Sequence, residues 1–317
     1  QVITHLSIEV QGYAPGGGIV SAEAAESVES LLLALRSGRF VCNQRMSTHI
    51  RCDSLAGTAV PYEAGGTRRE GAVMMRTSGK NQGSVYIYTE DLPRSLAHTR
   101  VGQVVHGVEL ARIAREGDSF AVRILPVKVD LIGYRLDDAE TFAGEQGVAL
   151  TPDHQGPDRM VIGQDPATTL DVLGAGAVSV TTVPVSQVID ISLDDANAPD
   201  SCRIFRELTG LKYHAVGRLP LFFAFDDVYL FQMKIPKTTN VKPENIPEEE
   251  VEAGVLAITN ESCKGVGLVG VRASDNSEFG PTSEPFSGTN MIGKVVDMEK
   301  LGSLKEGDMV FFREVGR

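Results

Sequence analysis

The chain has 317 residues, of which 42% are hydrophobic and 23% charged, and its formal net charge is −12. This length exceeds what one ordinary core accommodates and predicts two or three domains. The acidic balance disfavours binding to nucleic acid, whose phosphates repel it, or to an anionic membrane surface. No apolar run approaches the roughly 20 residues that a membrane-spanning helix needs.

Cysteine usage bears on the cellular compartment. The four cysteines, Cys42, Cys52, Cys202 and Cys263, include no CxxC pair, and no signal-peptide pattern is visible in the first residues given. Such a count is far below that of a disulfide-stapled domain, so we expect reduced thiols in a cytoplasmic protein. The chain begins without Met, inside a strand-like pattern, so we also expect a further N-terminal part.

The first third of the chain reads as a β-rich module with one longer helix. Alternating apolar residues predict a strand over Gln1–Gln11, and a turn holding Ala14-Pro15 follows. Apolar residues at three- and four-residue spacing predict an amphipathic helix over Ala22–Ser37, with Ser21 as its N-cap. Strands are predicted within Phe40–Val60, Gly71–Thr77, Val85–Thr89, Val101–Val105 and Phe120–Leu125, and a short helix or turn over Val108–Arg115.

The segment Lys128–Val183 has a different pattern. It predicts short helices over Leu136–Glu145 and Thr168–Leu173, with a strand over Met160–Ile162 between them. We therefore expect a small β-α-β insert that joins two larger domains. The predicted boundaries are residues 1–127 for the first domain, 128–186 for the insert and 187–317 for the second domain.

The pattern of the first third returns after this insert. A strand over Val188–Leu193 precedes Ala198-Pro199, and a helix is predicted over Asp200–Thr209. Strands are predicted over Leu219–Phe225 and Val228–Met233. The proline-containing, acidic stretch Lys234–Glu252 predicts a solvated linker.

The closing stretches of the two modules align in order, residue type and spacing. Val101-Gly-Gln-Val-Val105 matches Ile292-Gly-Lys-Val-Val296, and Glu116-Gly-Asp118 matches Glu306-Gly-Asp308. Upstream of both, Gly71 opens a strand as Gly254 does. These landmarks predict that the chain contains an internal repeat.

The order of elements in each module resembles the cyclophilin-like barrel. The predicted fold is therefore mainly β with some α: two tandem cyclophilin-like β-barrels whose closed sheets leave no exposed edges. Prolyl isomerase activity is not expected, and no catalytic residue is assigned. Where cyclophilins carry Phe-His-Arg, this chain reads Thr48-His-Ile-Arg-Cys52, and it contains no Trp.

Two motifs raise other kinds of site. Cys42, His49 and Cys52 are candidate metal ligands, but they lack tight pairing, and strand parity sets His49 on the opposite face, which favours structural thiols. Gly265-Val-Gly-Leu-Val-Gly270 spells a dinucleotide fingerprint. That fingerprint must open a helix, and the residues after it do not favour one, so the interpretation is disfavoured.

The segment Asp275–Asn290 is long, lacks periodicity and carries prolines and phenylalanines. Long irregular loops in compact domains are often functional, and exposed phenylalanines are costly without a partner. We therefore expect this loop to contact a partner protein. The candidate contact residues are Phe279, Pro281, Glu284, Phe286 and Asn290.

Four stretches together resemble the methanogenesis marker protein 3 family: Gly83–Asp91 (GSVYIYTED), Val101–Leu110 (VGQVVHGVEL), Lys264–Arg272 (KGVGLVGVR) and Asp275–Val295. The resemblance runs from about Val60 to the end of the chain, and more faintly over the residues before it. The family is longer at its N-terminus, so the resemblance implies that this chain is the C-terminal part of such a protein.

The resemblance implies a role in the activation of methyl-coenzyme M reductase in archaea that make or consume methane. We expect a non-catalytic adaptor that binds the reductase and other activation proteins. The nickel tetrapyrrole, iron–sulfur clusters and ATP of that assembly are implied by the resemblance only, and no cofactor is expected on this chain, which has no P-loop. Two alternatives remain open: a peptide-binding chaperone or prolyl isomerase, and a protein that binds a metal cluster.

Overall fold

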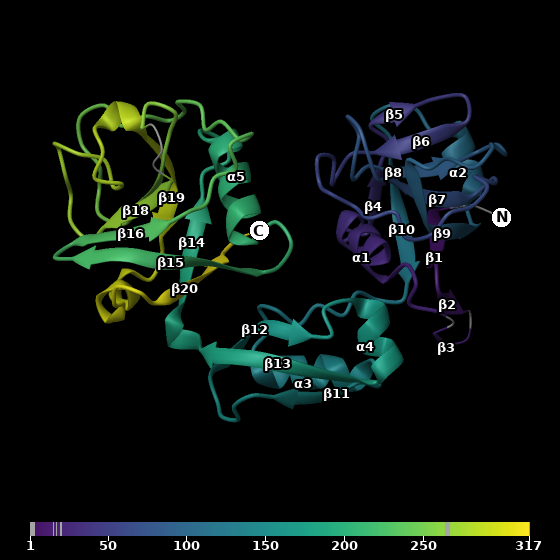
Figure 1. The fold of residues 1–317 in the computed structure, drawn as a ribbon, viewed down its shortest axis with the longest axis horizontal. Coiled ribbons are helices and arrows are strands. Elements are labelled where there is room, and N and C mark those ends of the chain that lie inside the picture. Colours follow the sequence, from purple (N-terminus) through teal and green to yellow (C-terminus); the bar gives the residue numbers. More distant parts are fainter. Residues whose placement is uncertain (1–3, 15, 17, 20, 264–266, 317) are drawn as a thin grey trace. The chain divides into compact units, whose positions relative to one another are not determined.

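A computed structural model describes residues 4–14, 16, 18, 19, 21–263 and 267–316 (Figure 1). The chain divides into two compact units: Gln1–Asp130 with Phe142–Thr151 and Asp165–Ser179, and Leu131–Thr141 with Pro152–Gln164 and Val180–Arg317. Because both units draw residues from the region 131–179, the predicted boundaries at 127 and 186 stay a prediction. None of the helices in the described residues is long and apolar enough to cross a membrane.

The first unit is built on a curled eight-stranded sheet with the order β4-β10-β1-β9-β7-β8-β6-β5. Its elements in chain order are β1 (His5–Val10), β2 (Tyr13–Ala14), β3 (Gly18–Ile19), α1 (Ala25–Ala34), β4 (Arg39–Val41), β5 (Gln44–Arg45), β6 (His49–Cys52), β7 (Ala72–Arg76), β8 (Val85–Tyr88), β9 (His98–His106), α2 (Val108–Ile113) and β10 (Ser119–Leu125). Buried Val28, Leu31 and Leu32 on one face of α1 belong to the same core as Leu6 and Ile8 of β1. Residues 1–3 of the predicted first strand, and Pro15 of the predicted turn, lie outside the described residues.

Three strands and two helices follow the first sheet. They are α3 (Leu136–Glu145), β11 (Ala149–Pro152), β12 (Arg159–Asp165), α4 (Thr169–Ala175) and β13 (Ala177–Pro184), and the strands form a sheet of order β11-β13-β12. Both predicted helices are present, and the predicted β-α-β outline was too simple because it lacked β11 and β13.

The second unit contains a closed barrel of order β14-β19-β17-β18-β16-β15-β20. Its elements are η1 (Val185–Gln187), β14 (Val188–Leu193), α5 (Pro199–Thr209), β15 (Val216–Phe225), β16 (Val228–Gln232), β17 (Val255–Thr259), β18 (Leu268–Arg272), η2 (Phe286–Gly288), β19 (Thr289–Val295), η3 (Met298–Ser303) and β20 (Met309–Glu314). Its core includes edge-to-face contacts of Phe312 with Phe205 and Phe231, at centroid distances of 6.3 and 5.1 Å.

Strand order confirms the predicted internal repeat. Around the first sheet the order β10-β1-β9-β7-β8-β6 matches β20-β14-β19-β17-β18-β16 around the barrel. In each unit the first strand pairs in parallel with the last, β1 with β10 and β14 with β20. The two units also share a β-bulge at the same place, after Val73 in β7 and after Leu256 in β17.

The two units differ at the strand that closes the sheet of the second unit into a barrel. In the barrel, β15 pairs with both β16 and β20. In the first unit the counterpart is interrupted between β4 and β5. The Cys42 N–H donates to Asp118 O and the Asn43 N–H donates to Arg51 O, so the chain changes partners at this step.

A carboxylate from a distant loop holds the start of the main helix in each unit. Glu63 accepts hydrogen bonds from the backbone N–H and hydroxyl of Ser27 in α1, at 2.6 and 2.5 Å. Glu244 accepts in the same way from the Ser201 N–H of α5, at 2.8 Å. The prediction that Ser21 caps the first helix was therefore wrong, because Ser21 Oγ accepts from the Glu23 N–H before the helix begins.

Glu244 also corrects the prediction of a solvated linker over Lys234–Glu252. This segment has no helix or strand, but Val241 and Val251 are buried, and the Asn245 side chain donates to Met291 O at 2.9 Å. The segment is therefore fixed to the barrel over part of its length.

Candidate functional site

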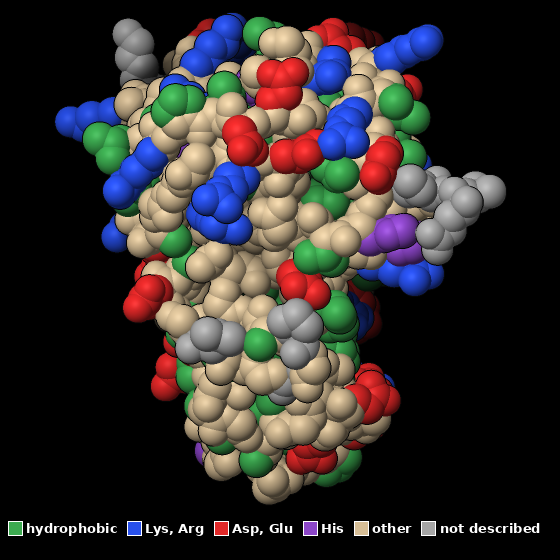
Figure 2. Space-filling model, turned by 90° about the vertical axis from the view of Figure 1, so that its right-hand side faces the viewer, with side chains coloured by type: hydrophobic (Ala, Val, Ile, Leu, Met, Phe, Trp, Pro, Cys, Tyr) green, Lys and Arg blue, Asp and Glu red, His purple; other side chains and the backbone are tan. Residues whose placement is uncertain are grey.

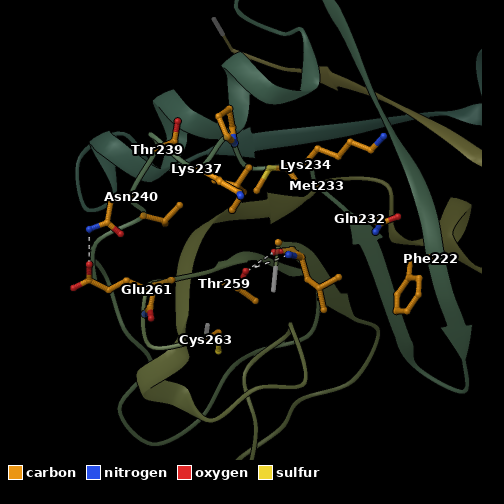
Figure 3. Close-up of a pocket in the computed structure, with 16 residues that line it drawn as sticks. Phe222, Gln232, Met233, Lys234, Lys237, Thr239, Asn240, Thr259, Glu261 and Cys263 are labelled. Carbon is orange, nitrogen blue, oxygen red and sulfur yellow. Dashed lines mark hydrogen bonds between the residues drawn. The ribbon is translucent and has the colours of Figure 1, made fainter. Parts of the chain in front are cut away.

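The second unit has an open cavity of about 750 Å³ at one end of its barrel (Figure 3). It lies where β16 and β17 end and β18 begins, and the segment after β16 borders it. Met233, Ile235 and Leu268 give it apolar walls, and Phe222 of β15 lies at its side. A volume of this size is in the range of about 300–1,000 Å³ that is usual for ligand sites.

The hairpin of β15 and β16, called here the aromatic hairpin, adjoins the cavity. The end of β15 is bulged between Leu221 and Phe223, so the strict alternation of inward and outward side chains is lost there. Phe222, Phe223 and Phe225 are 53, 38 and 73% exposed, and the rings of Phe223 and Phe225 lie 6.5 Å apart. Exposed apolar side chains gathered in this way are typical of surfaces that bind proteins.

The face of the molecule in Figure 2 has a different character. Side chains of both charges intermingle on it, and hydrophobic side chains are scattered. Scattered apolar residues are normal on a protein surface and indicate no particular partner.

Most polar groups of the cavity are already bonded within the protein. Thr259 Oγ1 accepts from the Leu268 N–H at 3.1 Å, and Asn240 Nδ2 donates to Glu261 Oε2 at 2.6 Å (Figure 3). Lys234 and Lys237 are exposed at the rim, and neither forms an ion pair with a described residue. The rim therefore presents two cationic groups beside an apolar interior.

The thiol of Cys263 also lines the cavity. Burial, together with the nearby Glu284 carboxylate, raises the pKa of Cys263 to about 11. The Sγ atom lies 3.6 Å from Gly288 O, in position to donate to it. At neutral pH this cysteine is a thiol, which is a poor nucleophile and a poor metal ligand.

The predicted partner loop is only partly available to a partner. Phe279 is 44% exposed, and Glu284 and Phe286 are partly buried. Asn290 is fully buried, where its Nδ2 donates to Ser201 Oγ and Lys242 O and its Oδ1 accepts from the Glu244 N–H. Pro281 is also buried. The prediction was therefore wrong for Asn290 and Pro281, which hold the loop on the barrel.

This loop covers the outer side of β18. A Cβ on Gly270 would lie closer than 3.0 Å to the carbonyl oxygen of Pro281, so the loop backbone rests directly on the strand. The sheet register makes Tyr86 of β8 the counterpart of Gly270, because Tyr86 pairs with Met74 as Gly270 pairs with Ala257. Loop backbone thus occupies in the second unit the place that a tyrosine side chain takes in the first.

In the first unit the corresponding face carries a buried aromatic cluster. Tyr86 packs edge-on to His98 at a centroid distance of 4.9 Å and lies 5.2 Å from His49, while Tyr88 stacks beside it. Ser95 Oγ lies 2.9 Å from His98 Nδ1, and His98 Nε2 has no hydrogen-bond partner in the described residues. Burial, then Arg76 and Arg68, lowers the pKa of His98 to about 4, so the ring is neutral.

The candidate metal ligands lie on two faces of the first sheet. Cys42 and Cys52 are buried in the core, where Cys42 Sγ lies 3.4 Å from Gln44 O, whereas His49 packs on the outer aromatic cluster. Within the described residues, no three His, Cys, Asp or Glu side chains are grouped to hold a metal ion.

The glycine fingerprint is only partly visible. Residues 264–266 lie outside the described residues, and Gly270 lies inside strand β18. Residues 273–285, which directly follow this strand, begin no helix, so the local geometry of a dinucleotide site is missing there.

A match to a family model indicates which class of domain the barrel is similar to. Residues 189–315, which form the barrel of the second unit, match a family model described as "Putative peptidyl-prolyl cis-trans isomerase domain". Among solved structures, an uncharacterized B. cereus protein covers 38% of this chain and 33% of its own, at 14% identity and a TM-score of 0.29, and this likeness supports no argument.

The relatives are proteins of methanogenic archaea. The chain is 37% identical to a UPF0288 protein of Methanosarcina barkeri over 100% of its own length and 60% of that protein. It is 38% identical to a UPF0288 protein of Methanothermobacter thermautotrophicus, over 93% of this chain and 57% of the relative. The chain therefore spans about three fifths of the length of the curated relatives that it matches.

Proposed function

We propose that the chain is a non-catalytic adaptor in the machinery that reductively activates methyl-coenzyme M reductase in methane-metabolising archaea. Its two units bind other proteins, the reductase and further activation proteins among them. The nickel tetrapyrrole, iron–sulfur clusters and ATP of that process belong to these partners. The observation that carries the proposal is the cavity of the second unit, open beside three exposed phenylalanines.

The chemistry of the described groups supports a binding role. The His98 ring is neutral and buried, and the Cys263 thiol is protonated at neutral pH. A general base needs a pKa near the working pH, and a nucleophilic cysteine needs a lowered one. The pKa of His98 is instead moved away from neutral pH, and the pKa of Cys263 is raised rather than lowered. The occurrence of the relatives in methanogens supports the cellular setting.

The test is affinity purification from a methanogen. A tagged full-length protein containing this chain is purified anaerobically, and its partners are identified by mass spectrometry. A variant with Phe222, Phe223 and Phe225 changed to Ser is purified in parallel, with Leu96→Ser as a matched control because Leu96 is an exposed apolar residue of the first unit. We expect the reductase with the wild type and the control, and its loss with the triple variant. Absence of the reductase and of activation proteins from the wild type refutes the proposal.

A prolyl isomerase or peptide-binding chaperone is the second candidate, favoured by the description of the matched domain model. The exposed phenylalanines beside the cavity support it, because they belong to the matched unit and aromatic-lined grooves bind proline-rich segments. A proline-peptide assay with the wild type and with Phe222→Ser tests it. Isomerisation no faster than background refutes the enzymatic half.

A further inference from the structure

We propose that the cavity of the second unit binds an acidic segment of a partner protein that inserts an apolar side chain between Lys234 and Lys237. This inference rests on the proposed adaptor function and names the chemistry of the partner. The apolar walls supply the site for the anchor, and the two lysines supply the charge. Anchors in pockets dominate the binding energy of interfaces, while rim charges set orientation and association rate.

Charge complementarity selects the occupant. The chain as a whole has a net charge of −12, whereas the rim of this apolar cavity carries two exposed lysines that have no ion-pair partner among the described residues. One acid, Glu261, lies at the same rim, where its Oε2 accepts a hydrogen bond from Asn240 Nδ2 (Figure 3). The two lysines outnumber this acid, and neither has an ion-pair partner among the described residues, so the rim attracts an acidic segment more than a basic one.

The internal repeat supplies a comparison for this end of the barrel. In the first unit the chain after β6 turns back tightly: Gly57 N–H donates to Gln82 O, and a Cβ on Gly83 would lie closer than 3.0 Å to Leu55 O. Asp53 Oδ1 then accepts from both Arg51 Nε and Ser84 Oγ at the strand ends. In the second unit the corresponding segment follows β16 and lines the cavity with Met233–Lys237.

The aromatic hairpin extends the same surface. Phe222 borders the cavity, and Phe223 and Phe225 continue along β15 beyond it. An extended acidic segment anchored in the cavity can cover these rings with its remaining apolar side chains. The proposed binding surface therefore consists of the cavity, its two lysines and these three phenylalanines.

The experiment measures binding of a labelled peptide, Gly-Asp-Glu-Leu-Phe-Glu-Asp-Gly, to the full chain by fluorescence anisotropy. One comparison peptide carries Ala in place of Leu and Phe, and another carries Lys in place of each acid. We expect each comparison peptide to bind about tenfold or more weakly, and binding to weaken as salt rises from about 0.05 to about 0.5 M.

Two variants test the position of the site. Thr239→Trp fills the cavity from its lining, and Lys234→Glu with Lys237→Glu reverses the rim charge. Both are expected to weaken binding about tenfold, whereas Lys80→Glu, at an exposed turn of the first unit, leaves it unchanged. Equal binding of the acidic and basic peptides, no binding at all, or undiminished binding by both variants overturns the inference.

The same variants separate this inference from the adaptor function. If the reductase is purified equally with the wild type and with Thr239→Trp, the cavity is not the partner site, although the adaptor function stands. If the peptide binds as expected but the wild type brings down no reductase, the site stands and the adaptor function falls.

Discussion

The carbonyl oxygen of Pro281 lies where a side chain on Gly270 would begin, closer than 3.0 Å to the position of its Cβ. Gly270 is in the middle of β18, and Pro281 is in the loop that covers it. The loop can therefore pack this closely on the strand only because residue 270 has no side chain.

Gly270→Ala tests this relationship. We expect a loss of about 1–3 kcal/mol in the free energy of unfolding, because the added methyl must push the loop backbone away. Urea denaturation measures the loss. Gly302→Ala is the control, since a Cβ at Gly302 meets no atom within 4 Å. Equal stability of the two variants contradicts the close packing of the loop on β18.

We expect the acid stability of the first unit to depend on His98. Its pKa falls from 6.5 to about 4 on folding, mainly because of burial. A histidine with a lowered folded pKa stabilises the protein fully above the unfolded pKa, and this contribution is lost as pH falls from about 6.5 toward 4. The loss amounts to up to about 3 kcal/mol.

Urea unfolding at a series of pH values measures this effect. His98→Gln is expected to flatten the dependence over that window, and His154→Gln, at an exposed position, to leave it unchanged. The same slope in the wild type and in His98→Gln shows that another group controls acid unfolding.

Cys263 is expected to react slowly with alkylating reagents. Its pKa is raised from 9.0 to about 11 by burial and by Glu284. Since the thiolate is the reacting form, its rate with iodoacetamide near pH 7.5 should be roughly 100-fold below that of the unfolded chain. Glu284→Gln should accelerate the reaction, and mass spectrometry of peptides identifies the site. A wild-type rate like that of the unfolded chain contradicts the environment described for this thiol.

Two acids of the same loop are expected to differ in their contribution to the stability of the protein, because only one of them caps a helix. Glu244→Ala removes the acceptor for the Ser201 N–H at the start of α5, and we expect a cost of about 1 kcal/mol. Glu248→Ala, an exposed acid in the same segment, should change stability by less than about 0.5 kcal/mol. Thermal melts of both variants compare them, and equal melting temperatures show that the cap contributes nothing measurable.

The repeat could be predicted because its landmarks are local. Alternating apolar residues and the matched glycines Gly102 and Gly293 indicate strands without knowledge of distant contacts. The helix over residues 136–145 was predicted from local end signals, an aspartate at its start and Gly147 past its end, and the helix over residues 200–209 from apolar residues on one face. The interruption between β4 and β5 was not predicted, because it depends on Asn43 changing its partner to Arg51.

The candidate site was only partly predictable. The segment after Gln232 has no periodicity, so nothing in the sequence indicated that it borders a cavity. The phenylalanines at 222, 223 and 225 were predicted as a strand, and the bulge that turns them outward depends on pairing with β16. Asn290 lies in a loop-like sequence but bonds to Ser201, 89 residues earlier, which no local pattern shows.

The parallel pairing of first and last strands has a mechanical consequence. In the second unit, Val188 to Ile191 of β14 pair with Phe311 to Glu314 of β20, both running in the same direction. A force that pulls the two ends of this unit apart therefore slides these strands along each other, and their hydrogen bonds bear the load together rather than one after another. The first unit has the same arrangement in β1 and β10. Each unit is thus suited to resist tension applied along its own chain.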